Sequence, residues 1–219
     1  MPLSVTLGGM RIVKRGHACL EVTESGKTLI IDPGDHTEAL DPSDLVAVVI
    51  THEHPDHWDA AHLSAIRERF PEAPIFGPPG VLEAAEEFEL VPVHAGETHT
   101  VGPFELQFFG GVHAVIHESI PVVDNVGVLV NGMLYYPGDS FAVPDATVDV
   151  LATPAGAPWL KISEVMDFVV AVAPKRTFAT HVMSLSEAGL AMSNARIRGA
   201  VEHVGGTHIM AEPGTVIEA

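Results

Sequence analysis

An apolar segment that leads directly into a dense cluster of titratable side chains constrains this chain more than any other feature. Residues 45–51 read LVAVVIT, a continuous run rich in β-branched residues that is typical of a strand buried on both faces of a sheet. Residues 52–59 read HEHPDHWD, and Asp59 is a suitable N-cap for a helix that we expect over residues 59–70, before Pro71. The cluster therefore lies on a strand-to-helix loop, where a rigid scaffold can present several side chains together.

Strand and helix patterns alternate along the rest of the 219 residues. Each half begins with strands and continues with strands that alternate with helices, and Asn131-Gly132 is a strong turn signal between two strands of a hairpin. This order predicts an α/β fold in which two mixed sheets pack face to face with helices outside, as one domain over residues 1–219. We expect strands over residues 10–14, 18–23, 27–32, 45–51, 75–77, 90–93, 104–109, 126–130, 133–136, 148–152, 177–180, 207–210 and 215–217, and helices over residues 59–70, 81–87, 161–173 and 186–203.

Charge and composition narrow the classes of partner. The chain has 29 acidic and 11 basic residues and a formal net charge of −18, which disfavours nucleic acid because such a surface repels phosphate backbones. No apolar run is long enough to span a bilayer and the N-terminal residues lack the order of a signal peptide, so we expect a soluble, cytoplasmic protein without a membrane partner. The single cysteine, Cys19, excludes an intrachain disulfide and a cysteine-based zinc site, and its neighbours predict a buried strand thiol.

The cluster itself predicts a metal site. His52 and His54 are two residues apart, so in an extended segment both imidazoles point the same way and can reach one ion. Asp56 and His57 follow Pro55, which turns the chain, and they can serve the same ion or an adjacent one. Six residues of the form His-x-His-x-Asp-His would be a costly arrangement unless a positive charge lies among them.

His-x-His-x-Asp-His after a hydrophobic strand resembles the signature of the metallo-β-lactamase superfamily, and other landmarks of that family follow in the expected order. The segments GHACLEV and HAVIH resemble a compact branch of zinc-dependent hydrolases that includes L-ascorbate-6-phosphate lactonase. The resemblance covers almost the whole chain. The landmarks are Asp32 in LIIDPG, His113 in GGVHAVIH, Asp139 in LYYPGDS and His181 in FATHVMS.

The resemblance implies an αββα four-layer sandwich and a centre of two metal ions, with Zn²⁺ as the first choice and Mn²⁺ or Fe²⁺ as alternatives. A hydroxide shared by the two ions would attack an ester, lactone or phosphodiester bond of a small molecule. Asp32 would accept hydrogen bonds that orient the ligand loop. The implied ligands are His52, His54 and His113 for one ion, Asp56, His57 and His181 for the second, and Asp139 as the bridge.

The downstream histidine ligand is chosen from two candidates. We prefer His113 to His117 because His113 directly follows the strand over residues 104–109 and a Gly110-Gly111 turn. His117 is then expected to line the pocket or contact substrate and to act in catalysis together with Asp56, with a surface role as the alternative.

Four further side chains have open roles. His17 is expected to be a core histidine, with a place behind the metal ligands as the alternative. Core packing is expected for Trp159, with a place near the rim of the site as the alternative. Tyr135 and Tyr136 alternate in direction on one strand, so one of them is expected to face the cleft.

Two other functions remain as alternatives. A mononuclear-iron oxygenase acting on a thiol substrate requires a redox metal with open coordination positions. A metal-binding scaffold without catalysis requires the ligands alone. The expected partner is a small-molecule substrate, and assembly into a homo-oligomer is left open.

Overall fold

The computed structural model describes residues 9–219 and arranges their strands in two mixed sheets of seven strands each. Residues 1–8, on which part of the signal-peptide prediction rests, lie outside the described residues. The first sheet has the strand order β14-β1-β2-β3-β4-β5-β6. Its strands are β1 (Arg11–Lys14), β2 (Leu20–Glu24), β3 (Lys27–Ile31), β4 (Leu45–Val49), β5 (Ile75–Gly77), β6 (Val91–Pro92) and β14 (Val216–Glu218).

The second sheet has the order β13-β12-β11-β10-β9-β8-β7. Strand β9 is antiparallel to both of its neighbours, β8 and β10, whereas β10, β11 and β12 are parallel to one another. Strands β8, β10 and β12 therefore run in one direction and end at the same edge of the sheet. The strands are β7 (Thr98–Val101), β8 (Phe104–Val112), β9 (Asp124–Val130), β10 (Leu134–Tyr136), β11 (Val150–Pro154), β12 (Arg176–Thr180) and β13 (Thr207–Ile209).

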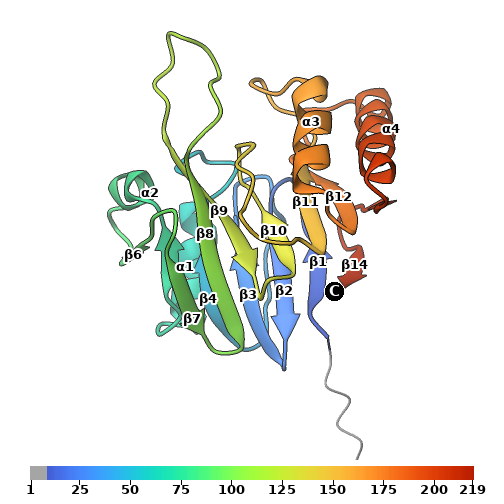
Figure 1. Ribbon diagram of the computed structural model, residues 1–219. Coiled ribbons are helices and arrows are strands. Elements are labelled where there is room, and N and C mark those ends of the chain that lie inside the picture. The colour runs from blue at the N-terminus through green and yellow to red at the C-terminus, as the bar shows by residue number, and fades with distance from the viewer. Residues whose placement is uncertain (1–8) are drawn as a thin grey trace, which may run out of the picture.

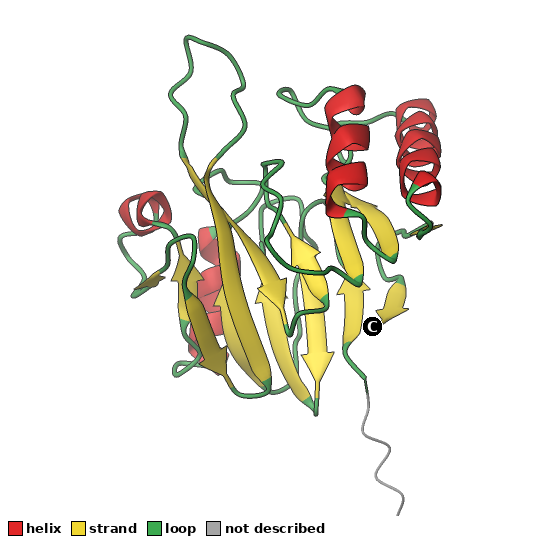
Figure 2. Cartoon of the chain, viewed as in Figure 1, coloured by secondary structure: helices red, strands yellow, loops and turns green. Residues whose placement is uncertain are grey.

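Helices cover the outer faces of both sheets (Figures 1 and 2). Helices α1 (Ala60–Arg69) and α2 (Pro79–Ala84) pack on the first sheet, where Leu63 and Val81 share a buried cluster with Val48. Helices α3 (Ile162–Val172) and α4 (Glu187–His203) pack on the second sheet, in the buried cluster that contains Leu151.

A third buried cluster lies between the sheets and joins residues such as Leu29 and Val49 of the first sheet to Leu106 and Val128 of the second. Burial of this apolar surface holds the two sheets together. The predicted αββα layering is therefore confirmed, whereas a single domain over residues 1–219 stays a prediction. Among residues 9–219, no helix combines the length and the apolar character that a membrane crossing requires.

Several local predictions are confirmed by the contacts that define them. The Asp59 carboxylate accepts a hydrogen bond from the backbone N–H of His62, as an N-cap does, and the predicted helix over residues 186–203 is present as α4, which Ser186 caps. Asn131 and Gly132 adopt φ values of 52° and 64°, as the tight turn between β9 and β10 requires.

The predicted turn at Gly110-Gly111 is wrong. Both glycines lie inside β8, where Gly110 pairs with Val126 and Gly111 with Asn125. Pairing with β9 supplies hydrogen bonds that override the local turn signal. The short strand β7 was not predicted, and α2 begins at Pro79 rather than at residue 81, because proline is compatible with the first turn of a helix.

Candidate metal centre

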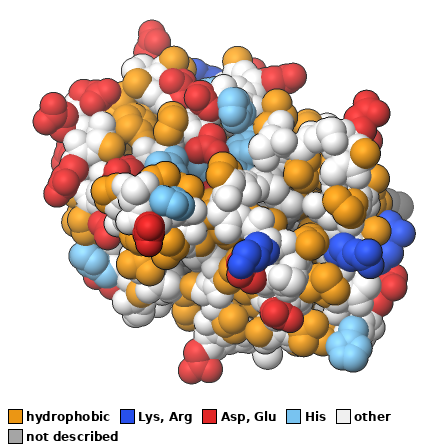
Figure 3. All heavy atoms as spheres, turned by 90° about the horizontal axis from the view of Figure 1, so that it is seen from above, with side chains coloured by type: hydrophobic (Ala, Val, Ile, Leu, Met, Phe, Trp, Pro, Cys, Tyr) orange, Lys and Arg blue, Asp and Glu red, His pale blue; other side chains and the backbone are white. Residues whose placement is uncertain are grey.

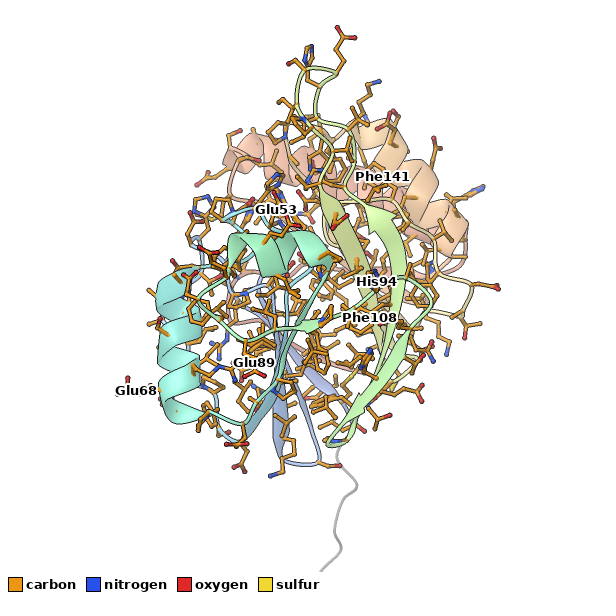
Figure 4. All side chains as sticks on the ribbon, turned by 90° about the vertical axis from the view of Figure 1, so that its left-hand side faces the viewer. Glu53, Glu68, Glu89, His94, Phe108 and Phe141 are labelled. Atoms are coloured by element: carbon orange, nitrogen blue, oxygen red, sulfur yellow. The ribbon has the colours of Figure 1, made fainter. Side chains whose placement is uncertain are left out.

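The predicted site residues lie at strand ends that meet at one end of the molecule. The loop after β4 carries the histidine cluster, and Asp32 follows β3, which is parallel to β4. In the second sheet His113 follows β8, Asp139 follows β10 and His181 follows β12. Viewed from above, histidine side chains reach the surface between acidic side chains (Figure 3). Glu53 lies at this end of the molecule, far from Glu68 of α1 (Figure 4).

One group of candidate ligands consists of His52, His54 and His113, whose ligand atoms lie within 4.8 Å of one another. Nε2 of His52 lies 3.1 Å from Nδ1 of His54. The centroid of the His113 ring lies 4.9 Å from that of His52 and 4.8 Å from that of His54. Two nitrogen ligands on one tetrahedral ion, with metal–nitrogen bonds of about 2.0–2.1 Å, lie roughly as far apart as these atoms of His52 and His54. The three side chains could hold one ion.

The second predicted set, Asp56, His57 and His181, is divided between two further groups of close ligand atoms, one of His17, Asp56 and His181 and one of His52, His57 and Asp139. Oδ2 of Asp56 lies 3.2 Å from Nε2 of His181 and 3.9 Å from Nε2 of His57. Asp139 lies between the two predicted sets, because its Oδ1 is 3.3 Å from Nε2 of His57 and its Oδ2 is 3.5 Å from Nε2 of His113. This is the place that the sequence predicts for a bridging carboxylate.

The hydrogen bonds of the imidazole rings fix which nitrogen faces inward. Nδ1 of His113 and of His181 donates to the backbone carbonyls of Ala114 and Gly156, which can only accept. The neutral rings therefore carry a free lone pair on Nε2, as metal-binding histidines do. Among residues 9–219, these two Nε2 atoms find no hydrogen-bond partner, nor do Nε2 of His57 and Oδ1 of Asp139. Buried polar atoms are rarely left in this state, so the donor set fits a bound cation.

The electrostatics of the metal-free protein also favour positive charge here. Burial lowers the pKa of His57, but Asp139 and Asp32 outweigh burial and hold that pKa well above its ordinary value. Burial likewise acts against the charged form of His181, yet the carboxylates of Asp139 and Asp56, each 3.2 Å from its Nε2, raise its pKa to about 9. Burial would raise the pKa of Asp139, and the neighbouring histidines instead hold it well below its usual range. The carboxylates therefore remain ionised and attract cations, whether protons or metal ions.

Asp32 anchors the ligand loop, in agreement with its predicted place. Its carboxylate accepts hydrogen bonds from the backbone N–H of Thr51 at 2.8 Å, from the Thr51 hydroxyl at 2.7 Å and from Nδ1 of His57 at 2.6 Å. Asp32 and His181 both have positive φ values, of 50° and 55°. Non-glycine residues in this region are strained, and such strain is common at functional sites. The loop also packs tightly, because a Cβ on Gly34 would lie 1.9 Å from the carbonyl oxygen of Asp56.

Trp159 and His17, for which core packing was the first expectation, lie beside the centre, where the alternative interpretations place them. Trp159 is nearly buried, and its indole Nε1 donates a hydrogen bond to Oδ2 of Asp139 at 2.8 Å. The apolar surroundings of Trp159 in the sequence contain no signal for this contact. His17 is buried with Nε2 at 3.1 Å from Oδ2 of Asp56. Its sequence signal is its place in GHACLEV, one of the segments that carry the family resemblance.

The structure does not bring His117 to the centre. This residue is exposed in the long loop between β8 and β9 that projects above the sheets (Figure 1), and its Nδ1 contacts the Ser119 hydroxyl at 2.8 Å. Its catalytic role stays a prediction without a supporting contact. Tyr135 and Tyr136 point to opposite sides of the second sheet, as expected, but both are buried in apolar clusters rather than in an open cleft. Cys19 is buried, as predicted.

Comparisons with known proteins agree with this geometry. A family model described as "Beta-lactamase superfamily domain" matches residues 11–181. Protein Rv0786c of Mycobacterium tuberculosis is 40% identical over 180 residues, which cover 78% of this chain and 84% of the relative.

Solved structures share the fold. Igni18, a metallo hydrolase from the archaeon Ignicoccus hospitalis, superposes with a TM-score of 0.72 at 18% identity, over 95% of this chain and 97% of its own. The metallo-beta-lactamase fold protein YhfI from Bacillus subtilis has a TM-score of 0.71 at 16% identity, over 97% of this chain and 100% of its own. A closer likeness to L-ascorbate-6-phosphate lactonase stays a prediction. The chain belongs to the family of beta-lactamase superfamily domains that the match to residues 11–181 defines.

Proposed function

We propose that this protein is a metal-dependent hydrolase that acts on a small molecule and holds two metal ions. The observation that carries the proposal is the set of inward-facing Nε2 atoms of His57, His113 and His181, which lack hydrogen-bond partners within residues 9–219. Five imidazoles and two carboxylates without a thiolate suit Zn²⁺, with Mn²⁺ and Fe²⁺ as alternatives. The description of Igni18 as a metallo hydrolase supports the same activity class.

Two carboxylates of the chain would have different roles in this reaction. Asp139 lies where it can bridge the ions and keep them close together. Burial raises the pKa of Asp56, but the hydrogen bond with His17 and the nearby rings of His181 and His57 outweigh burial and hold the pKa below its usual range. Asp56 is therefore ionised at neutral pH, and its carboxylate can accept a proton from an attacking water. The bound ions would supply Lewis acidity that activates water for attack on an ester, lactone or phosphodiester bond. The proposed ligands are His52, His54 and His113 for one ion, and Asp56, His57 and His181 for the other.

A cavity beside the centre supports a small substrate. It has a volume of about 440 Å³ and is lined in part by Ile116, Phe141, Trp159 and Lys161. Trp159 lines the cavity and also donates a hydrogen bond to Asp139, so this side chain connects the cavity wall to the proposed metal site. The net charge of −18 argues against a polyanionic partner such as nucleic acid.

The test is a screen of lactone, phosphodiester and thioester substrates with zinc-loaded, iron-loaded and chelator-treated protein. We expect turnover of at least one substrate class, its loss with chelator and its return with Zn²⁺. His54→Ala should abolish turnover, whereas His203→Ala, which removes an exposed histidine of α4, should not. Turnover confined to the iron form with consumption of O₂ would support the oxygenase instead. If neither the wild type nor His54→Ala turns over any substrate, and the two proteins differ only in stability, the result would support the non-catalytic scaffold.

A further inference from the structure

His17 is a histidine beside the centre that the proposed ligand set does not use. It lies in the turn between β1 and β2 and is only 3% exposed. Its Nε2 is 3.1 Å from Oδ2 of Asp56, and the two residues form a group with His181 whose ligand atoms lie within 4.8 Å of one another. Distance alone would therefore make His17 an eighth metal ligand.

The hydrogen bonds of the His17 ring argue against that role. The backbone N–H of Met183 donates to Nδ1 of His17 at 3.1 Å. An amide nitrogen can only donate, so Nδ1 carries the lone pair and Nε2 carries the proton in the neutral ring. This is the reverse of His113 and His181, whose Nδ1 atoms donate to carbonyl oxygens. A protonated Nε2 has no lone pair for a metal, but it can donate to the carboxylate in front of it.

We infer that His17 is a positioning residue, whose Nε2–H orients the Asp56 carboxylate for the second ion. A carboxylate oxygen has two lone pairs, so Oδ2 of Asp56 can accept this hydrogen bond and still bind an ion. The Asp56 side chain is 27% exposed, and among the described residues His17 makes the hydrogen bond that restrains it. This inference rests on the proposed function, because it assigns a role toward one of the proposed ions.

The backbone of His17 strengthens this role. Its carbonyl oxygen accepts a hydrogen bond from the N–H of His181 at 2.9 Å, and the centroids of the two rings are 3.9 Å apart. His17 therefore ties the turn of the first sheet to the end of β12 in the second sheet. His17 thereby fixes the position of Asp56, from the first half of the chain, relative to His181, from the second half. Hydrogen-bond partners of this kind typically change metal affinity or activity by about 10–100-fold when they are removed.

The ring tautomer is the direct readout. Long-range ¹H–¹⁵N correlation spectra of protein labelled at histidine distinguish a protonated from an unprotonated ring nitrogen, and the His17 signals are assigned by their absence in His17→Gln. We expect His17 to carry its proton on Nε2 in both the metal-free and the zinc-loaded protein. A proton on Nδ1, or zinc bonded to Nε2, would overturn the inference.

Variants test the positioning effect on metal binding. In His17→Gln the side-chain amide lies near the position of Nε2 and still donates to Asp56. In His17→Asn the amide lies near the position of Nδ1 and retains only the acceptor for Met183. His17→Phe retains neither hydrogen bond. In titrations with Co²⁺ followed by visible absorption, we expect binding of the second ion to weaken about 10–100-fold in His17→Asn and His17→Phe. His17→Gln should stay within a few fold of wild type, as should the control His203→Gln, which changes an exposed histidine of α4. The site at His52, His54 and His113 should be unchanged in all four.

Equal loss of the second ion in His17→Gln and His17→Phe would contradict a positioning role, and so would unchanged binding in His17→Asn. If His17→Phe does not fold, the affinities of His17→Gln and His17→Asn for the second ion still test the positioning role. Wild-type protein that binds no second ion would contradict the proposed function, while the tautomer of His17 in the metal-free protein still tests the ring assignment.

Discussion

The indole Nε1 of Trp159 donates a hydrogen bond to Oδ2 of Asp139 across 2.8 Å, inside a region closed to solvent. The backbone N–H of Asp139 is held as well, by Oδ1 of Asn125 at 2.9 Å. One carboxylate oxygen of Asp139 thus has a fixed donor, while Oδ1 has no hydrogen-bond partner in the described part of the chain and faces His57. The two contacts hold the central carboxylate in one orientation, and each can be removed separately.

Replacing Trp159 by Phe removes the donor while retaining most of the ring. We expect metal affinity or metal-dependent activity to fall about 10–100-fold, because the Asp139 carboxylate loses its restraint. The matched control is Tyr135→Phe, which removes a hydrogen bond from a buried aromatic side chain to the backbone carbonyl of Ala142 instead. Metal titration of both variants is the measurement, and equal effects in the two would contradict a specific role for Trp159.

Replacing Asp32 by Asn should unfold the site. The carboxylate accepts three hydrogen bonds from Thr51 and His57, and an amide has a single acceptor oxygen. Breaking such a buried, charged network typically costs about 3–5 kcal/mol. Urea denaturation of the metal-free protein measures this cost. The control Asp35→Asn changes an exposed carboxylate three residues away and should shift stability by less than about 0.5 kcal/mol.

Gly138 and Gly132 form a matched pair with φ values of 62° and 64°. A Cβ on Gly132 meets nothing within 4 Å, so Gly132→Ala should cost only the strain of the left-handed backbone, roughly 1–2 kcal/mol. A Cβ on Gly138 would lie 2.5 Å from Oδ1 of Asn125 and 2.7 Å from Cβ of Thr51. Gly138→Ala should therefore cost about 1–3 kcal/mol more and should also weaken metal binding, because it displaces Asp139. Thermal or urea unfolding would show the difference, and equal losses would refute it.

The metal-free protein should lose stability in alkaline solution. The pKa of His181 is about 9 in the folded protein and about 6.5 when unfolded. Because folding raises this pKa, the stabilisation is fully present below about pH 6.5 and is lost as the pH rises through about 9. His57, whose pKa is also raised, contributes in the same direction. We expect the free energy of unfolding to fall by on the order of 3 kcal/mol over this range. His181→Gln should show a weaker dependence, and stability that rises over the same range would contradict the assignment.

Much of the centre could be predicted because its signals are local. The apolar strand before His52 and the spacing of His52, His54 and His57 place the ligand loop at a strand end without knowledge of the fold. The family resemblance, rather than strand geometry, implied His113, Asp139 and His181, and the structure explains why they meet, because the strands before them run in one direction and end at one edge. Asp32 was also implied by the resemblance, and it closes a strand parallel to β4.

What could not be predicted depends on contacts between distant segments. Trp159 reaches Asp139 across 20 residues of sequence, and its indole donor looks the same in the sequence as that of a core tryptophan. The role of the His17 ring depends on the N–H of Met183, which lies 166 residues away. Strand β8 continues through Gly110 and Gly111 because β9 pairs with them, although their local preference is for a turn.

Metal content, determined by elemental analysis of protein purified without added metal, tests the central claim most directly. The account predicts two transition-metal ions per chain, with zinc as the main element, and loss of one ion in His54→Ala and of the other in His181→Ala. Protein that contains no stoichiometric metal, or whose metal content is unchanged in both variants, would contradict it.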